Sequence, residues 1–202
     1  MTDNIHPIFD SILNRTNKEL LLNQKGVVVW LTGLSGSGKS TIAKGVEQRL
    51  YDNQIITKLL DGDNLRTGLN SNLGFTENDR EENIRRVAEV AKLFVETGIV
   101  TLCSFVSPTF AIRQNARAII GESDFLEVYV KASFENCTKR DVKGLYKKAL
   151  AGEIKNFTGL DAPFDEPKQP AVLLNTNIQT IEESIDTLYN SIIKHIKPNA
   201  VI

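Results

Sequence analysis

Short apolar runs alternate with longer stretches of helical periodicity along most of the chain. The run Val27–Leu31 is continuous and rich in β-branched residues, which is typical of a strand buried on both faces of a parallel sheet. Between Asn78 and Thr97, apolar residues recur at helical spacing, and Gly98 follows them. The whole pattern predicts strands at 27–31, 55–60, 99–105, 125–130 and 172–174, and helices at 41–50, 78–97, 108–120, 134–141 and 181–196. Because strands and helices alternate, the sequence predicts an α/β fold with a mainly parallel five-stranded sheet.

Two segments differ from this alternation. Residues 1–25 are polar with scattered apolar points, so we expect an N-terminal helical arm followed by one domain at 26–202. Residues 142–169 are charged and interrupted by glycines and prolines, which predicts a long functional loop that acts as a mobile lid. Ligands of parallel α/β sheets bind beyond the carboxyl ends of the strands. The turns after Leu31, Leu60 and Phe105 should therefore share one functional edge.

The turn after the first strand matches the phosphate-binding pattern GxxxxGK[ST] completely, with a strand before it and a helix after it. Its glycines allow successive backbone N–H groups to point at an anion, and the following helix adds the positive end of its dipole. Lys39 would reach the β- and γ-phosphates, and the Ser40 hydroxyl would bind Mg²⁺. The predicted ATP cradle consists of Gly33, Leu34, Ser35, Gly36, Ser37, Gly38, Lys39, Ser40 and Thr41.

A second turn carries two carboxylates, Asp61 and Asp63, at the end of the next predicted strand. One could take a proton from an acceptor hydroxyl, and the other could hold a Mg²⁺-bound water. A purely structural interpretation is an Asp-Gly turn in which Asp63 or Asn64 caps a helix. Because the turn follows a phosphate cradle, we favour the functional interpretation, with Asp61 as the general base and Asp63 as the alternative. The candidate metal-binding residues are Ser40, Asp61 and Asp63.

Composition narrows the class of protein further. The 24 Lys and Arg nearly balance the 25 Asp and Glu, which disfavours general nucleic-acid binding. Two cysteines cannot make a disulfide framework, and two histidines near opposite ends argue against a His-rich metal site or a Ser-His-Asp hydrolase. No apolar run approaches the roughly 20 residues of a membrane span, and the start has no secretory pattern. We therefore expect a cytoplasmic enzyme or binding domain without a membrane partner.

Several further motifs occur in order along the chain, and together with the cradle they resemble the adenylylsulfate kinase (APS kinase) family of P-loop kinases. The matching segments are 33–41, 60–66, 68–70, 73–75, 79–86, 105–108, 140–149, 152–155 and 157–161. The resemblance implies a three-layer P-loop fold and transfer of phosphate from MgATP to the ribose 3′-hydroxyl of adenylylsulfate. It also implies a homodimer, and functional coupling to a separate ATP sulfurylase is an open possibility.

The resemblance implies roles for individual residues as well. Arg140 would lie against the ATP adenine. Arg66 and Arg80 offer forked donors for a phosphosulfate, while Phe75 and Phe164 are candidate walls for an adenine ring. The full substrate-binding set is Arg66, Phe75, Arg80, Asn83, Val106, Ser107, Lys143, Leu145 and Phe164. The basic lid would close over the phosphates and exclude water.

Ser107 has three competing interpretations. Family members are commonly given a phosphoserine at the matching position, which would make Ser107 a catalytic residue and the chain a phosphoprotein. The hydroxyl could instead serve as a helix N-cap before Pro108. Direct phosphoryl transfer needs no covalent intermediate, so we favour a substrate-side role.

Two other functions stay open. A different small-metabolite kinase, of the gluconate or shikimate type, could share the fold but would not need the Phe157–Phe164 segment or the Arg66, Arg80 and Asn83 set. A non-catalytic nucleotide-binding regulator would be expected to lose Lys39, Ser40 or the aspartate pair, and all are present.

Overall fold

The computed structural model describes residues 4–197 and contains one parallel sheet of five strands in the order β2-β3-β1-β4-β5. The strands are β1 (Val27–Thr32), β2 (Thr57–Asp61), β3 (Val100–Ser104), β4 (Phe125–Lys131) and β5 (Val172–Asn175). The predicted α/β class and the five parallel strands are confirmed. The central strand β1 pairs on one side with β3 and on the other with β4.

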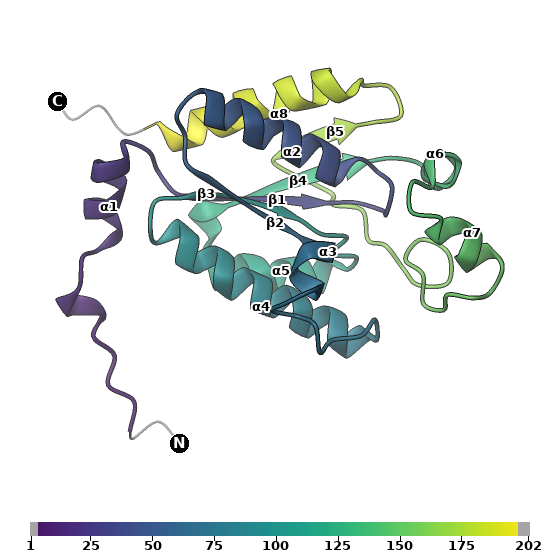
Figure 1. The fold of residues 1–202 in the computed structure, drawn as a ribbon, viewed down its shortest axis with the longest axis horizontal. Coiled ribbons are helices and arrows are strands. Elements are labelled where there is room, and N and C mark those ends of the chain that lie inside the picture. The colour runs from purple at the N-terminus through teal and green to yellow at the C-terminus, as the bar shows by residue number, and fades with distance from the viewer. Residues whose placement is uncertain (1–3, 198–202) are drawn as a thin grey trace.

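Helices cover both faces of the sheet, so the molecule has three layers (Figure 1). One face carries α2 (Lys39–Asp52) and α8 (Ile181–Ile196), and the other carries α4 (Glu77–Val95) and α5 (Phe110–Ile120). Alternate residues of β1 supply the two cores, because successive side chains of a strand point to opposite faces. Val27, Val29 and Leu31 join the α2 and α8 core, and Val28 and Trp30 join the α4 and α5 core.

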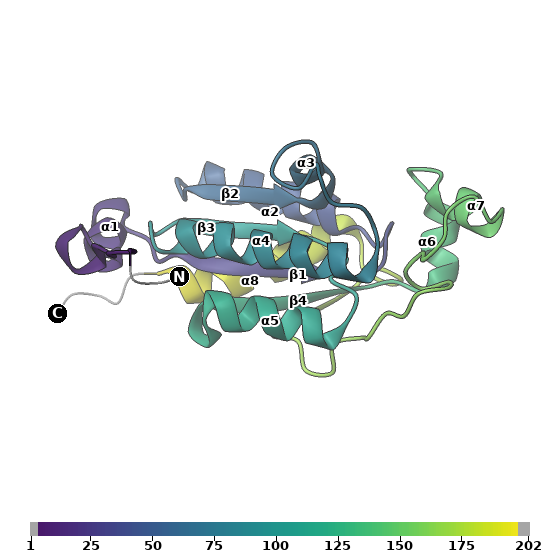
Figure 2. The same ribbon diagram turned by 90° about the horizontal axis from the view of Figure 1, so that it is seen from below.

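The predicted lid interval contains a helix that the sequence analysis described only as loop. After α6 (Phe134–Arg140) the chain forms α7 (Leu145–Leu150) before returning to β5. Figure 2 shows α6 and α7 projecting together beyond one end of the sheet. They share a small separate core in which Tyr146 packs edge-on against Phe134 and Phe157. Residues 142–169 are therefore a partly helical unit with its own packing.

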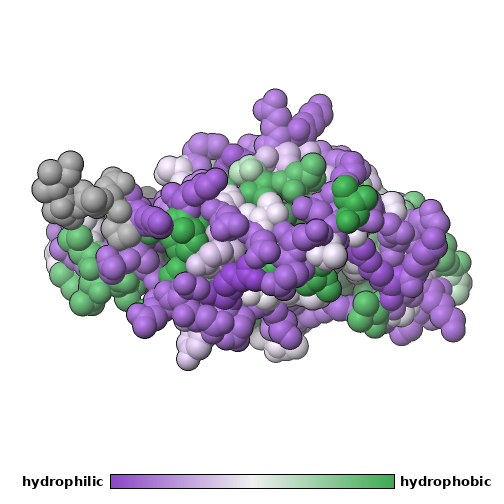
Figure 3. Space-filling view, turned by 90° about the horizontal axis from the view of Figure 1, so that it is seen from above, coloured by the Kyte–Doolittle hydropathy of each residue, from purple (hydrophilic) through white to green (hydrophobic). Residues whose placement is uncertain are grey.

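The amino-terminal residues lie at the opposite end of the sheet. This segment contains a 3₁₀ turn (Phe9–Ser11) and α1 (Arg15–Leu22). Arg15 anchors α1 by donating to Asp124 and to the Gly26 carbonyl, next to a second 3₁₀ turn (Glu122–Asp124). Several apolar side chains before and on α1 stay exposed, and Figure 3 shows hydrophobic surface gathered at this end.

Two local predictions were wrong. The helix predicted to open at Pro108 begins at Phe110 instead, because the Thr109 side chain accepts the Ile112 N–H and acts as the N-cap. The stretch after β2 also forms a five-residue helix, α3 (Gly62–Arg66), that was not predicted. Its cap is Asp61, which accepts the Asp63 N–H, and neither Asp63 nor Asn64. Within residues 4–197 no helix combines the length and apolar character needed to cross a bilayer.

Candidate active site

The carboxyl ends of β1, β2 and β3 bring three functional turns to one edge of the sheet, beside α6 and α7 (Figure 2). The phosphate cradle follows β1, the aspartate turn follows β2, and residues 105–108 follow β3. The lid lies at the same edge. The sequence-based placement of the three turns on one edge is confirmed.

The cradle is a tight turn that leads directly into α2. Gly33 has a positive φ, and a Cβ there would collide with the Val130 carbonyl of β4, so only glycine fits. Ser37 closes the turn by donating its N–H to the Leu34 carbonyl at 3.1 Å. The Ser37 hydroxyl is buried and has no hydrogen-bond partner in the described chain. Such an orphaned polar group inside a cradle fits a site built to receive polar ligand atoms.

Lys39 is buried under this turn, and its Nζ donates to the carbonyls of Gly33 and Leu34 at 2.8 Å each. Burial lowers the pKa of Lys39 to about 8, because desolvation disfavours the ammonium, and Lys143 adds repulsion. The negative charges of Asp61 and Asp63 act to raise the pKa of Lys39. The ammonium is thus held where a phosphate chain in the cradle would meet it.

Ser40 joins the cradle to the aspartate turn. Its hydroxyl donates to Asp61 Oδ2 at 2.6 Å and lies 3.1 Å from the Ser104 hydroxyl at the end of β3. The sequence analysis missed Ser104, although its position at a strand end was the available signal. These oxygens are the hard donors that Mg²⁺ takes alongside substrate phosphates and waters. No group of three or more His, Cys, Asp and Glu side chains suited to a metal occurs in residues 4–197.

Polar contacts tie the lid to the aspartate turn, to the cradle and to α4. Lys143 forms an ion pair with Asp63. Tyr146 donates its hydroxyl to the Ser35 carbonyl of the cradle at 2.8 Å. From α4, Arg80 donates to the Thr158 hydroxyl at 2.6 Å and to the Asn156 carbonyl. The lid is therefore held down over the cradle and over the aspartate turn.

Arg140, at the end of α6, forms an outer wall of the cradle. It donates to the carbonyl and hydroxyl oxygens of Thr176 at 2.6 and 3.1 Å and reaches the Gly36 carbonyl at 3.3 Å. Thr176 in turn donates to the Ser37 carbonyl at 2.9 Å. Thr176 was not among the predicted residues, because no spacing rule connects the turn after β5 to the cradle.

The predicted substrate residues of α3 and α4 form a second group. The Arg66 guanidinium lies over the Phe75 ring, 4.3 Å from its centroid, and donates to the Leu73 and Gly74 carbonyls. Burial lowers the pKa of both Arg66 and Arg80. Asn83 is buried and accepts from the Asn70 amide at 2.9 Å. Asn83 thus braces the turn of Asn70. The two arginines are half-buried and donate to backbone carbonyls and to the lid, while the Phe75 ring is exposed.

Phe164 lies elsewhere, in the wall of a cavity of about 560 Å³ between the cradle and the lid. Its ring packs on Tyr129 of β4, with centroids 6.1 Å apart. The described lining includes Leu34, Phe134 and Phe164 but not Phe75, so the two predicted ring walls lie on different parts of the site. Leu145 is half-buried and packs against the small core of the lid.

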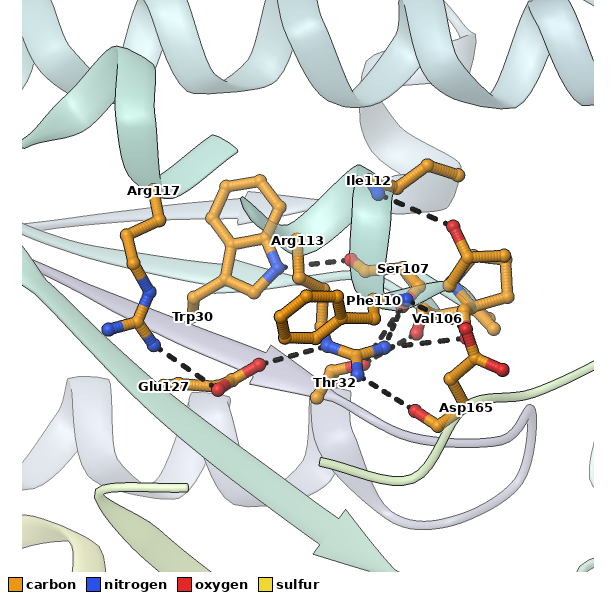
Figure 4. Close-up of polar contacts among 12 residues, drawn as sticks. Trp30, Thr32, Val106, Ser107, Phe110, Ile112, Arg113, Arg117, Glu127 and Asp165 are labelled. Atoms are coloured by element: carbon orange, nitrogen blue, oxygen red, sulfur yellow. Dashed lines mark hydrogen bonds and ion pairs between the residues drawn. The ribbon is translucent and has the colours of Figure 1, made fainter. Parts of the chain in front are cut away.

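Ser107 is buried beneath this edge (Figure 4). Its hydroxyl accepts the Trp30 indole N–H at 3.0 Å, and its backbone has a φ of +44°. Thr32 donates to the neighbouring Val106 carbonyl at 2.7 Å. Ser107 is not the helix N-cap, which is Thr109. The turn of Val106 and Ser107 is instead a floor tied to the sheet.

Comparisons with known proteins agree with this geometry. The model of the family described as adenylylsulphate kinase matches residues 25–175. An adenylyl-sulfate kinase of Phocaeicola vulgatus is 58% identical over 186 residues, covering 92% of this chain and 91% of the relative. One of Bacteroides fragilis is 54% identical over 194 residues, 96% of each protein. A Mycobacterium tuberculosis APS kinase, solved in complex with AMPPNP and APS, is 43% identical with a TM-score of 0.81, covering 84% of this chain and 98% of that one. The chain therefore belongs to the adenylylsulphate kinase family.

Proposed function

We propose that this protein transfers the γ-phosphoryl group of ATP to the ribose 3′-hydroxyl of adenylylsulfate, giving 3′-phosphoadenylylsulfate and ADP. The observation that carries the proposal is the meeting of a complete phosphate cradle, the Asp61–Asp63 turn and the Arg66 and Arg80 pair at one end of the sheet. Its 43% identity to an APS kinase solved with AMPPNP and APS supports the substrate assignment. The reaction would be an in-line displacement that depends mainly on positioning and charge neutralisation.

ATP would bind with its phosphates in the cradle of residues 33–41 and its adenine beside Arg140. Backbone N–H groups and the start of α2 provide partial positive charge for the phosphates. Lys39 would exchange its two carbonyl acceptors for phosphate oxygens. Because the Lys39 ammonium is already desolvated, this exchange adds little further desolvation cost.

Magnesium would be held by the Ser40 hydroxyl beside the Asp61–Asp63 turn, where the carboxylate that does not act as the base would hold a Mg²⁺-bound water. When bound, Mg²⁺ neutralises negative charge on the transferring phosphates. The hydroxyl and carboxylate oxygens present are of the type that Mg²⁺ prefers, and few protein ligands are needed when substrate phosphates supply others.

Asp61 is our choice for the general base, with Asp63 as the alternative. Asp61 ends β2, and its two oxygens are oriented by the Ser40 hydroxyl and the Asp63 N–H. Asp63 is more exposed and is paired with Lys143 of the lid. A fixed carboxylate can accept the acceptor's proton without reorganisation, which supports Asp61.

Adenylylsulfate would lie between α4, the lid and the floor after β3. Arg66 and Arg80 would bind its charged phosphosulfate, and Phe75 and Phe164 would contact the ring from different sides. Lys143 and Leu145 would contribute from the lid, and Asn83, Val106 and Ser107 would shape the floor. Closure over the site would exclude water, which otherwise competes as acceptor.

We also infer a cytoplasmic homodimer supplied with adenylylsulfate by a separate ATP sulfurylase. The exposed apolar side chains of Phe9, Leu13 and Leu21 support an association surface at the amino-terminal end.

A coupled assay of ADP release with MgATP tests the main proposal. Adenylylsulfate, gluconate, shikimate and no acceptor are compared. We expect turnover only with adenylylsulfate, and its loss in Lys39→Ala and Asp61→Asn. If ATP binds but adenylylsulfate is not phosphorylated, the proposed function is wrong and another acceptor or a regulatory role replaces it. The pH–rate profiles of Asp61→Asn and Asp63→Asn then decide which carboxylate is the base.

A further inference from the structure

Arg113 of α5 is a fully buried arginine for which the proposed reaction has no role. Its side chain is 1% exposed and lies between the floor after β3 and the last part of the lid segment, at Asp165 (Figure 4). A charged group in such a position is costly unless every donor is satisfied. Its contacts therefore indicate what it organises.

The guanidinium uses its three nitrogens on three separate elements. Nε donates to Glu127 of β4 at 2.9 Å, Nη1 to the Ser107 carbonyl at 2.9 Å, and Nη2 to the Asp165 carbonyl at 2.8 Å. The planar fork of arginine holds these acceptors in fixed relative directions, which a lysine ammonium cannot do. Arg113 thus connects the sheet, the floor of the site and the last part of the lid segment.

Asp165 is held by two more contacts. Its N–H donates to the Pro108 carbonyl at 2.8 Å, and its carboxylate accepts the Phe110 N–H at 2.9 Å. With the bond from Arg113, three contacts fix this one residue to the turn between β3 and α5. Phe164 is its immediate neighbour, so the backbone that carries the Phe164 ring cannot shift without breaking them.

Arg117, one turn further along α5, shows that the ion pair alone does not explain this arrangement. It also reaches Glu127, at 3.3 Å, but its second partner is the exposed Glu122. The Arg117 side chain is 21% exposed, and within residues 4–197 it makes no hydrogen bond to the floor or to Asp165. The same helix and the same carboxylate thus offer a matched control for the contacts that are special to Arg113.

We propose that Arg113 is a positioning residue for the acceptor substrate: by fixing Asp165 to the floor of the site, it holds the neighbouring Phe164 ring in the position from which it would contact adenylylsulfate. The ring's place against Tyr129 and beside the cradle depends on a backbone that Arg113 anchors. This inference rests on the proposed role of Phe164 in substrate binding.

Arg113→Lys tests the proposal, with Arg117→Lys as the control. The lysine keeps the charge beside Glu127 and loses the fork. We expect the KM for adenylylsulfate to rise about tenfold, while the KM for ATP and kcat change less than about threefold. Arg117→Lys should leave all three constants within about twofold of the wild type. The proposal would be overturned if Arg113→Lys changed the KM for ATP as much as the KM for adenylylsulfate. It would also be overturned if Arg117→Lys raised the KM for adenylylsulfate selectively.

A double-mutant cycle with Phe164→Ala identifies the route of the effect. If Arg113 acts by placing the ring, Arg113→Lys should add little to the KM for adenylylsulfate once the ring is gone. An undiminished effect in that background contradicts the proposal. If Phe164→Ala by itself leaves this KM unchanged, the substrate role of Phe164 is what fails. If Arg113→Lys does not fold, Asp165→Ala is the second variant, because it removes the contact with the Phe110 N–H. We expect this variant, too, to raise the KM for adenylylsulfate more than the KM for ATP.

Discussion

At the scale of single residues, Lys39 makes nucleotide binding sensitive to mildly alkaline pH. Burial lowers the pKa of Lys39 to about 8, so the ammonium is present below that pH and is lost above it. Phosphate binding needs the charged form. We therefore expect the Kd for ATP to be nearly constant from pH 7 to 8 and then to weaken, by at most about tenfold per pH unit. Calorimetric titration of ATP between pH 7 and 9.5 measures this.

Lys39→Met is the control for that titration. The variant should bind ATP more weakly throughout and lack the added loss above pH 8, because no ammonium remains to titrate. A wild-type affinity that stays flat to pH 9 would show that the lysine keeps its charge in the free protein.

The hydrogen bond between the Ser107 hydroxyl and the Trp30 indole N–H predicts a contribution of Ser107 to stability. Ser107→Ala leaves the buried Trp30 indole N–H without its acceptor, and we expect about 1–3 kcal/mol less free energy of unfolding. Urea denaturation measures this, and Ser71→Ala in an exposed turn should change stability by less than about 0.5 kcal/mol. Equal stability of Ser107→Ala and wild type would contradict the structural role.

The same residue can be tested for a phosphoenzyme. We expect wild-type protein mixed with γ-labelled ATP to carry no labelled serine, because the hydroxyl is buried and already bonded to Trp30. If Ser107 becomes labelled, and the label is lost when unlabelled ATP and adenylylsulfate are added, the result would instead support the covalent intermediate.

Single-residue chemistry was predictable where it followed a local pattern. The cradle from Gly33 to Thr41 has a spacing that its chemistry requires, so its place and partners could be inferred from sequence. The partnership of Asn83 with Asn70, and of Ser107 with Trp30, depends on contacts between distant segments. No spacing rule encodes such contacts.

At the scale of helices and strands, long periodic segments were predictable and short ones were not. Helices α4 and α8 have enough turns for their apolar period to appear in the sequence. By contrast, α3 and α7 have five and six residues, and isolated helices of that length are unstable. They form because Asp61 caps one, and because Tyr146 and Ala149 of the other pack into the lid core.

The lid's attachment to the cradle gives a prediction at this scale. Tyr146→Phe removes the bond from the lid to the Ser35 carbonyl but keeps the packed ring. We expect ATP to bind about threefold to tenfold more weakly, corresponding to about 0.5–1.5 kcal/mol. Proteolysis within residues 142–163 should also become faster. Tyr189→Phe on α8, outside the lid, should change neither the affinity for ATP nor the rate of proteolysis. If Tyr146→Phe leaves both unchanged, the contact does not hold the lid.

At the scale of the whole molecule, the five parallel strands were predictable from alternation, but their order β2-β3-β1-β4-β5 was not. Every strand of this sheet contributes apolar side chains to the core, and hydrophobicity alone does not determine which strands pair. The order depends on pairings over long stretches of chain, such as Val27 with Val100.

The proposed dimer is also a property of the whole molecule. Replacing Phe9 and Leu13 with glutamate would put charge on the exposed apolar surface of the amino-terminal end. We expect sedimentation to change from dimer to monomer, with the fold unaltered because both side chains are exposed. A wild-type monomer, or a double variant that stays dimeric, would place the association surface elsewhere.

The central place of β1 has a consequence for synthesis on the ribosome. This strand is wholly buried in the finished sheet, yet its neighbours β3 and β4 follow it by about 70 and 100 residues. At about 5–20 residues per second, the nascent chain exposes this apolar segment for several seconds before either neighbour exists. The strand that is made first gains its second neighbour only when β4 has been made. We therefore expect the nascent chain to bind chaperones, and slower translation to increase its tendency to aggregate.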